Sequence, residues 1–503
     1  MTTQPHFSTL DLVVLVGYFA LTMAIGLAFW SKSRTVDGFT AAGRSQPGWL
    51  LGLSILGTYV SSISFLALPG KAYASNWNPF VFSLALPLAT WIGVRWFLPF
   101  YRNLGNVSAY SHLEQRFGPW ARVYASACYL LTQLARVGTV TYLMALPMSA
   151  LLGWDIRWII LITGLTTTFY TFISGIVGVL WTDAVQTVIL IGGAAACALI
   201  MVFSLPEGPG QLFEIAAVGD KFSLGSFGAS LAAPTFWVVL FYGLVINLQN
   251  FGIDQNYVQR YIAASSDREA RKSLWLGGLL YLPLSAIFFF IGTALFAYYT
   301  TFPAALPDAL RDPAKADSVF PHFMVTVLPS GVTGLLIASV FAAAMSTVSS
   351  CLNSSATIIL SDYYKRYINR TATERQSMRV LYGATIAWGV GGTLIALAMT
   401  RVPSALDAWW LLAGIFGGGV LGLFLLGFLA RRAHNRAALV GVVCGALVIL
   451  WTTLSNVWSG MPAMLRSPFH GFLTLGLATT TVLLVGLLAT VFLAPKPRAP
   501  VGS

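Results

Sequence analysis

The chain has 503 residues, of which 57% are hydrophobic and only 9% are charged. A soluble domain carries about 25% charged residues, so this composition excludes a soluble globular protein and indicates a polytopic membrane protein. The formal net charge of +12 does not indicate nucleic-acid binding, because the basic residues gather in short loops between apolar segments, where they act as topology signals facing anionic lipid.

Apolar segments long enough to cross a bilayer recur along the whole chain. About thirteen are expected, at 9–30, 47–70, 79–101, 121–150, 157–176, 183–204, 235–256, 273–299, 319–361, 378–400, 404–430, 437–457 and 469–494. The longest loops between them, about 205–234 and 300–318, are too short to form a separate core. The sequence therefore predicts an all-α protein with a single transmembrane domain over 1–503.

Most lysine and arginine residues fall in one set of alternate loops. That set holds Lys32, Arg34, Arg44, Arg102, Arg116, Arg122, Arg260, Arg268, Arg271, Lys272, Lys365, Arg366, Arg370, Arg375, Arg379, Arg431, Arg432, Arg436, Lys496 and Arg498, and the opposite loops hold only Lys71, Arg157, Lys221, Arg311, Lys315, Arg401 and Arg466. Because cytoplasmic loops carry the excess of basic residues, we expect a multi-pass protein of the plasma (inner) membrane with its N-terminus outside and its C-terminus in the cytoplasm. The first apolar segment lacks the features of a cleaved signal peptide and is expected to be retained.

Cysteine and histidine give no sign of a metal centre or an enzyme. The four cysteines, Cys128, Cys197, Cys351 and Cys444, are scattered within apolar runs, and the five histidines are unpaired in the sequence. A membrane-embedded enzyme using serine and aspartate side chains would lack a histidine base or a metal cluster. We therefore expect neither enzymatic activity nor an organic cofactor.

Two of the predicted spans are interrupted by polar residues. In GLSILGTYVSSISFLALPG, Gly57 precedes a polar patch and Pro69–Gly70 is expected to end the segment; in NLQNFGIDQNYVQRY, Gly252 lies among amide side chains and Asp254. Helix breaks at membrane depth are tolerated where the backbone lines a cavity or is buried in protein. A pair of broken spans five spans apart is typical of transporters built from inverted repeats.

The stretch FAAAMSTVSSCLNSSATIILSD, at 341–362, carries many hydroxyl side chains. On a helix, Ser346, Ser349, Ser350 and Asn353 share one face, with Thr347 on its flank. Hydroxyl and carbonyl oxygens are the ligands that a dehydrated alkali cation prefers. Small residues at this spacing also let membrane helices pack closely without binding anything, so the pattern alone leaves both interpretations open.

Two ionisable residues fall within or at the start of spans. Arg136 lies in the middle of YLLTQLARVGTVTYL, where it either clamps a substrate carboxylate or holds helices together through backbone carbonyls. Asp183, in GVLWTDAVQ, either supplies a negative charge to a cation site or caps the start of a helix.

The motifs GTYVSSISFLALPGKAY, GVLWTDAVQ, DQNYVQRYI and FAAAMSTVSSCLNSS followed by SDYY resemble those of the sodium/solute symporter family, and they occur in the family's order over nearly the whole chain. The resemblance implies a LeuT-type fold of five plus five inverted repeats, with 9–30 as an extra N-terminal helix, 47–204 and 235–430 as the repeats, and 437–494 as two extra C-terminal helices. Within the family the chain is most similar to the bacterial sialic acid branch, through YVSSISF, Asn76–Trp77, LARVGTVTYL and QRYI.

The resemblance also implies one or two bound sodium ions. The first site would be formed by the carbonyls of Gly57, Val60 and Ala343 and the hydroxyls of Ser346 and Thr347. The second would be formed by Asp183, Ser346, Ser349 and Ser350.

For the substrate, the resemblance implies that Arg136 binds a carboxylate together with Ser61 and Ser64. Tyr59 stands where the sialic acid branch has a threonine, and Ser83 stands where it has a glutamine, so the shape and hydrogen bonding of the pocket differ here. Asn247 and Phe251, in the second broken span, complete the predicted substrate residues.

We therefore expect a monomeric sodium-coupled symporter, embedded in the lipid bilayer, that imports a small organic anion, with sialic acid or a similar carboxylate as the leading candidate. Import of a neutral solute, such as a sugar, an amino acid or a vitamin, with Arg136 in a structural role, remains the alternative. A sensor with a fused signalling domain is not expected, because only about nine residues follow the last predicted span.

Overall fold

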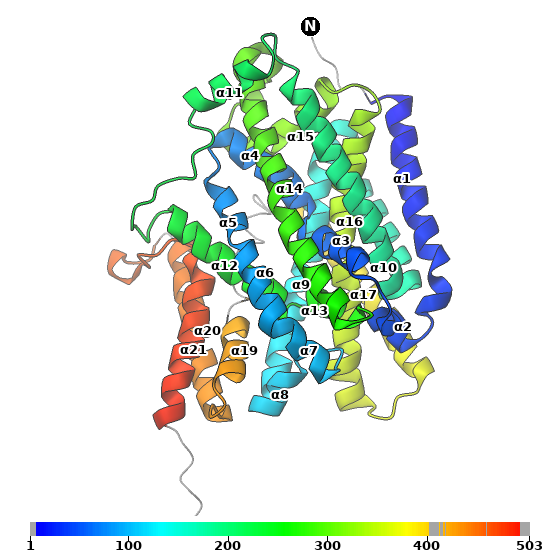
Figure 1. Cartoon of the computed structure of the whole chain (residues 1–503), viewed down its shortest axis with the longest axis vertical. Helices are drawn as coiled ribbons and strands as arrows, with labels where there is room; N and C mark the ends of the chain where they lie inside the picture. The colour runs from blue at the N-terminus through cyan, green and yellow to red at the C-terminus, as the bar shows by residue number, and fades with distance from the viewer. Residues whose placement is uncertain (1–6, 402–411, 413–415, 418, 459, 493–503) are drawn as a thin grey trace, which may run out of the picture.

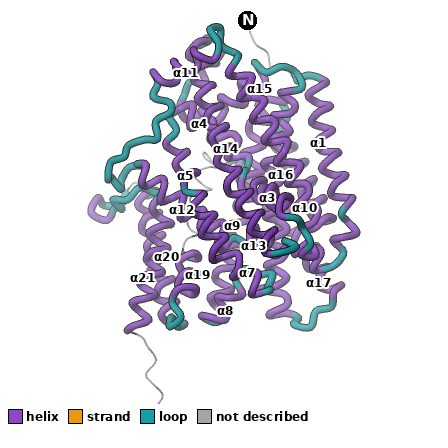
Figure 2. The backbone as a smooth tube through the Cα atoms, viewed as in Figure 1, coloured by secondary structure: helices purple, strands orange, loops and turns teal. Residues whose placement is uncertain are grey.

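The computed structural model describes residues 7–401, 412, 416–417, 419–458 and 460–492, drawn in colour in Figure 1. Within these residues every regular element is a helix and none is a β-strand (Figure 2). The fold class predicted from the composition and the apolar segments is therefore confirmed for this part of the chain.

The main helices follow one another without a soluble insertion. They are α1 (Thr9–Ala28), α2 (Val36–Ala41), α3 (Gly48–Tyr59), α4 (Ser62–Ala74), α5 (Val81–Leu84), α6 (Leu86–Ile92), α7 (Leu98–Leu104), α8 (Ser111–Phe117), α9 (Pro119–Leu152), α10 (Ile156–Val202), α11 (Pro209–Val218), α12 (Phe236–Ile253), α13 (Gln255–Ala263), α14 (Asp267–Thr301), α15 (Val319–Thr326), α16 (Val332–Ile358), α17 (Glu374–Met399), α19 (Val420–Leu429), α20 (Asn435–Val457) and α21 (Leu473–Phe492). A π-helical segment, Ile359–Ile368, continues α16.

The first interrupted span is a sharply bent pair of helices. The backbone of Val60 and Ser61 is extended, and α3 and α4 meet there at a bend of 59°. The expectation that Pro69–Gly70 ends this segment is wrong, since α4 holds Pro69 in its interior and continues to Ala74. The second interruption, between α12 and α13, lies at Asp254 rather than at Gly252, because Asp254 is extended and accepts a hydrogen bond from the backbone N–H of Asn256 at 2.7 Å.

Two span boundaries differ from the prediction. The loop expected between 176 and 183 is absent, because α10 runs from 156 to 202 and its two helices meet directly at Gly175, whose φ of +51° is accessible to glycine. The span expected at 319–361 is divided into α15 and α16 by the residues from Val327 to Gly331, and the helical segment then continues beyond 361 to Ile368.

The described residues contain nine helices long and apolar enough to cross a membrane, or ten if the bent pair α3–α4 counts as one span. The number thirteen thus stays a prediction, and most of the first half of the expected span 404–430 lies outside the described residues. The most apolar 18-residue window of α16 is 94% buried, whereas that of α1 is only 28% buried. Helix α16 therefore forms the centre of the bundle, while α1 lies at one edge and α20 and α21 lie at the other (Figure 1).

Candidate functional site

A cluster of oxygen atoms lies where the bend between α3 and α4 meets α16. The hydroxyl of Ser346 donates to the carbonyl of Gly57 at 2.7 Å and lies 3.3 Å from that of Ala343. The hydroxyl of Thr347 lies 3.4 Å from the carbonyl of Val60 and 3.1 Å from that of Ala343. All five residues predicted for the first sodium site therefore lie together, and all are buried.

The chemistry of this cluster fits a small alkali cation. Because the helix breaks at Val60, the carbonyls of Gly57 and Val60 are directed to side-chain hydroxyls rather than to the amides of a continuing helix. Both hydroxyls can rotate their protons away and turn lone pairs toward an ion, which gives two hydroxyl and three carbonyl oxygens in one place. Hard, neutral oxygen ligands of this kind are those that replace the hydration shell of an alkali ion.

Gly57 also brings α3 close to α10. A side chain at this position would lie 2.5 Å from the hydroxyl oxygen of Thr187 and 3.3 Å from the carbonyl oxygen of Asp183. The hydroxyl of Thr187 in turn donates to the carbonyl of Leu53 at 3.0 Å. This close approach places Asp183 within reach of α3 and of the serine face of α16.

Asp183 is fully buried and paired with Arg260, a residue that the pattern of basic residues predicts to lie in a loop. Its Oδ2 accepts from the Nη2 of Arg260 at 2.8 Å and from the hydroxyl of Ser54 at 2.6 Å. The same Nη2 donates to the hydroxyl of Ser350 at 2.7 Å, and that hydroxyl lies 3.0 Å from the hydroxyl of Thr58. The assignment of Arg260 to a cytoplasmic loop is wrong, since its side chain is 1% exposed.

The four residues predicted for the second sodium site are neighbours in this structure, but a cation of the protein lies among them. Ser349 donates to the carbonyl of Ser346 at 3.1 Å, and Ser350 connects through Arg260 to Asp183. The Oδ1 of Asp183 is buried and has no hydrogen-bond partner among the described residues. A buried carboxylate oxygen without a partner is unfavourable, so this atom is available to a further cation.

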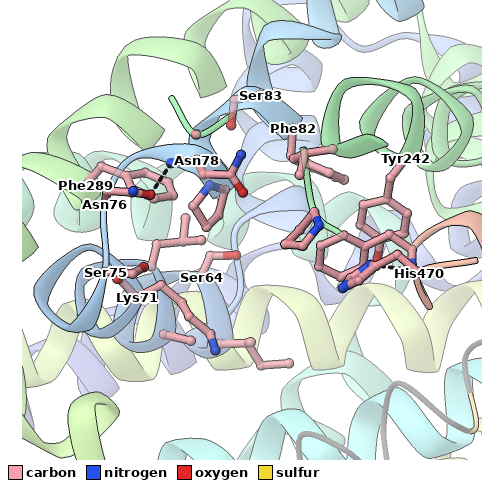
Figure 3. Close-up of a pocket in the computed structure, with 18 of the residues that line it drawn as sticks. Ser64, Lys71, Ser75, Asn76, Asn78, Phe82, Ser83, Tyr242, Phe289 and His470 are labelled. Atoms are coloured by element: carbon pink, nitrogen blue, oxygen red, sulfur yellow. Dashed lines mark hydrogen bonds between the residues drawn. The ribbon is translucent and has the colours of Figure 1, made fainter. Parts of the chain in front are cut away.

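A cavity of about 850 Å³ lies beside the bend. Of the predicted substrate residues, Tyr59, Ser64, Ser83 and Arg136 line it, and Ser61, Asn247 and Phe251 do not. Figure 3 shows Ser64 and Lys71 of α4 on one side of the cavity and Tyr242 and His470 on another. Its volume falls within the range of small-molecule sites, and aromatic side chains contribute much of its lining.

Arg136, in α9, connects the cavity to the oxygen cluster. Its Nη2 donates to the carbonyl of Thr58 at 3.3 Å, and Thr58 lies between the two backbone ligands Gly57 and Val60. Arg136 also lines the cavity, and a guanidinium group in this position can donate two parallel hydrogen bonds to a carboxylate.

Aromatic residues form the wall next to Arg136. The Tyr59 hydroxyl donates to the Oδ1 of Asn247, and the Tyr59 ring lies 4.4 Å from that of Tyr281 and 6.2 Å from that of Phe251, measured between centroids. Asn247 and Phe251 therefore lie behind Tyr59 and support it instead of lining the cavity. The short Ser83 side chain is also occupied, with its hydroxyl 2.9 Å from that of Ser285.

A loop packs against the C-terminal end of α4. The ammonium group of Lys221 donates to the carbonyls of Tyr73 at 2.7 Å and Ser75 at 2.8 Å, and it lies 3.9 Å from the centre of the Phe296 ring. Burial lowers the pKa of Lys221 from its usual value. This lysine satisfies two carbonyls that the end of α4 leaves without helical partners.

Comparisons with known proteins give a consistent result. A sequence model described as "Sodium:solute symporter family" matches residues 39–445. The sodium/sialic acid symporter NanT of Aliivibrio fischeri is 34% identical over 479 residues, which is 93% of each chain. SiaT of Proteus mirabilis is 35% identical over 448 residues, covering 88% of this chain and 89% of its own. Human sodium-coupled monocarboxylate transporter 1 is 27% identical, covering 91% and 75% respectively.

Solved structures agree with the sequence comparisons. A sodium-coupled sialic acid symporter, solved in a substrate-bound outward-open state, matches with a TM-score of 0.89 at 31% identity, covering 98% of this chain and all of that one. The nucleobase–cation symporter Mhp1, in a closed conformation, matches with a TM-score of 0.58 at 17% identity over 92% of this chain and 96% of its own, which shows a shared fold alone.

Proposed function

The chain belongs to the sodium:solute symporter family, and from that premise we propose that it couples inward sodium flow to the import of a small carboxylate, with a sialic acid as the leading candidate. It is a transporter rather than an enzyme. The observation that carries the substrate class is the position of Arg136, which lines the cavity while its Nη2 donates to the Thr58 carbonyl in the bend.

Among the described residues, no carboxylate lines the cavity beside Arg136, and Asp254, whose charge interacts with that of Arg136, forms no ion pair with it. Placing an arginine at membrane depth costs about 2.5–3.5 kcal/mol on insertion scales, so its presence at a cavity wall favours an anionic partner. The relatives that are sodium/sialic acid symporters support a sugar acid. The aromatic wall formed by Tyr59, Tyr257 and Tyr281 favours a smaller and more apolar carboxylate as a second candidate, in line with the monocarboxylate relatives.

We propose two sodium sites, formed by the residues that the sequence predicts. The first comprises the carbonyls of Gly57, Val60 and Ala343 with the hydroxyls of Ser346 and Thr347. The second comprises Asp183 with Ser346, Ser349 and Ser350, and it is supported by the unpartnered Oδ1 of Asp183. When sodium is bound, it supplies the positive charge that this oxygen lacks.

A second ion has a clear energetic purpose for an anionic substrate. A membrane potential of ~100 mV contributes roughly 2.3 kcal/mol per sodium ion, and a tenfold sodium gradient contributes about 1.4 kcal/mol more. A monoanion moving inward loses about 2.3 kcal/mol against the same potential, so one sodium ion supports only about tenfold accumulation. Two sodium ions leave about 5 kcal/mol, which corresponds to several thousandfold.

For topology, we propose a monomer in the plasma (inner) membrane with its N-terminus outside, and with 47–204 and 235–430 as the two repeats. Helix α1 begins and α21 ends at opposite faces of the bundle (Figure 1), which supports an odd number of spans. The bends at α3–α4 and α12–α13 each fall near the start of one proposed repeat.

The test is uptake into proteoliposomes that contain the purified protein, under an inward sodium gradient and with potassium as the control ion. The panel comprises sialic acids, short monocarboxylates and neutral sugars. Sodium-dependent accumulation of an acid supports the proposal, and accumulation of neutral solutes alone would contradict the substrate class while leaving sodium coupling intact.

A further inference from the structure

A second hollow, of about 480 Å³, lies at the opposite end of α9 from the outer loops. It is lined by Arg122, Lys365, Arg366 and Arg370, together with Ser361. Arg122 comes from the first turns of α9, and the others come from the π-helical segment that continues α16 and from the residues just after it. Four of the five lining residues are therefore basic and converge on one space.

The carboxylates nearby neutralise only part of this charge. Arg122 donates to Glu114 at 3.0 Å and to Asp362 at 2.6 Å, and Arg366 pairs with the other oxygen of Glu114. No ion pair joins Lys365 or Arg370 to a residue in the part of the chain that the structure describes. Four cations against two carboxylates leave an excess of two positive charges.

Two donors at this hollow have no partner. The Nε atoms of Arg122 and Arg366 are buried and make no hydrogen bond to a described residue. Buried donors of this kind are uncommon in folded proteins and call for an acceptor. Topology signals require only that basic residues lie on the correct side of the membrane, so the positive-inside rule does not explain why these side chains converge with free donors.

The hollow also lies where lipid headgroups would be. It adjoins the end of the helical segment Val332–Ile368, at the same face as α8 in Figure 1. Tyr367 and Ile368, which directly follow Arg366, are 53% and 73% exposed. Exposed tyrosine and aliphatic side chains beside basic residues are typical of the boundary between the acyl chains and the headgroups.

From the converging cations, the two free donors and this position, we propose that the hollow lined by Arg122, Lys365, Arg366 and Arg370 is a binding site for a phosphate group. Guanidinium groups bind phosphate oxygens in pairs, and the excess of two positive charges matches a phosphate oxyanion. Either an anionic phospholipid headgroup or free inorganic phosphate presents this group. Neither sodium nor the transported substrate takes part, so the inference is independent of the proposed function.

The test uses the purified full-length chain and measures binding in two arms. In the first, native mass spectrometry gives the affinity for phosphatidylglycerol, with diacylglycerol, which lacks the phosphate group, as the comparison. In the second, thermal unfolding is followed with inorganic phosphate against chloride at equal ionic strength. Both arms compare the wild type with Lys365→Gln/Arg370→Gln, in which the removed side chains make no ion pair, and with Arg436→Gln, an exposed basic residue of α20 that does not line the hollow.

We expect the double variant to bind the phosphate-bearing probe about thirtyfold more weakly, because each basic residue near such a surface strengthens binding about fivefold to sixfold. The Arg436→Gln variant should bind as the wild type does. Loss in the lipid arm alone identifies a headgroup, and loss in the phosphate arm alone identifies the free ion. Equal binding by the double variant and the wild type in both arms, or an equal loss in Arg436→Gln, would overturn the proposal.

Discussion

Replacing Asp183 by asparagine separates its role in stability from its role in sodium coupling. In the wild type, its carboxylate accepts from Arg260 at 2.8 Å and from Ser54 at 2.6 Å, and both charges are fully buried. Removing one member of a buried ion pair leaves the other charge uncompensated, which costs about 3–5 kcal/mol. We therefore expect Asp183→Asn to lower the free energy of unfolding by that amount, measured by denaturant titration in mixed micelles.

The double variant Asp183→Asn/Arg260→Gln removes both charges and should recover most of this loss, because the remaining groups are neutral and can still hydrogen bond to Ser54 and Ser350. Its sodium dependence should nevertheless stay altered. If Asp183 is a ligand of the second sodium ion, uptake in proteoliposomes will rise with sodium concentration along a curve consistent with one ion, whereas the wild-type curve will require two.

Asp308→Asn provides the control, since the Asp308 side chain is 92% exposed and should affect neither property. Unchanged stability of Asp183→Asn would refute the buried ion pair. A double variant that retains the wild-type steepness of sodium dependence would refute Asp183 as a sodium ligand, even if the ion pair is correct.

Three further substitutions, one of them with a matched control, test the first sodium site, the aromatic wall and the Lys221 loop. Ser346→Ala should abolish sodium-stimulated uptake while the protein stays folded, and Ser355→Ala, which removes a buried hydroxyl of the same helix that has no partner among the described residues, should leave uptake unchanged. Tyr59→Phe removes the hydroxyl that donates to Asn247, so it should weaken substrate binding by about fivefold to tenfold in an uptake competition assay, without changing the sodium dependence. Lys221→Met should lower the thermal unfolding midpoint, because two carbonyls at the end of α4 lose a charged donor worth about 1.5–3 kcal/mol each; an unchanged midpoint would contradict the role assigned to the loop.

The sequence predicted the features that depend on local pattern. The serine face of α16 follows from helical spacing, and the bend at Val60 follows from a polar patch within an apolar span. The resemblance to the symporter family then predicted that the carbonyls of Gly57 and Val60 lie near the hydroxyls of Ser346 and Thr347. In the structure these groups are within hydrogen-bonding distance.

Local sequence patterns could not predict which side chains from distant segments contact one another. Arg260 lies in a polar stretch, and its charge alone placed it in a loop, but α13 is buried throughout its length and the partner of Arg260 is 77 residues away. A signal was present, because Gln255, Asn256, Gln259 and Arg260 recur at helical spacing on one polar face, and Asp183 needed a counter-charge. Asn247 and Phe251 do not line the cavity for a similar reason: Tyr59 contacts both, and the direction of its side chain is not specified by spacing in the sequence.

Binding of a substrate carboxylate by Arg136, next to a sodium site, is best tested by comparing the uptake of an acid with the uptake of its ester. Proteoliposomes with an inward sodium gradient and an inside-negative potential are given N-acetylneuraminic acid or its methyl ester, which lacks the negative charge. We predict sodium-dependent uptake of the acid only, and its loss in Arg136→Gln, since two charge-assisted hydrogen bonds worth about 3–6 kcal/mol in total disappear. Equal uptake of the ester, or acid uptake that persists in potassium or in Arg136→Gln, would contradict the claim.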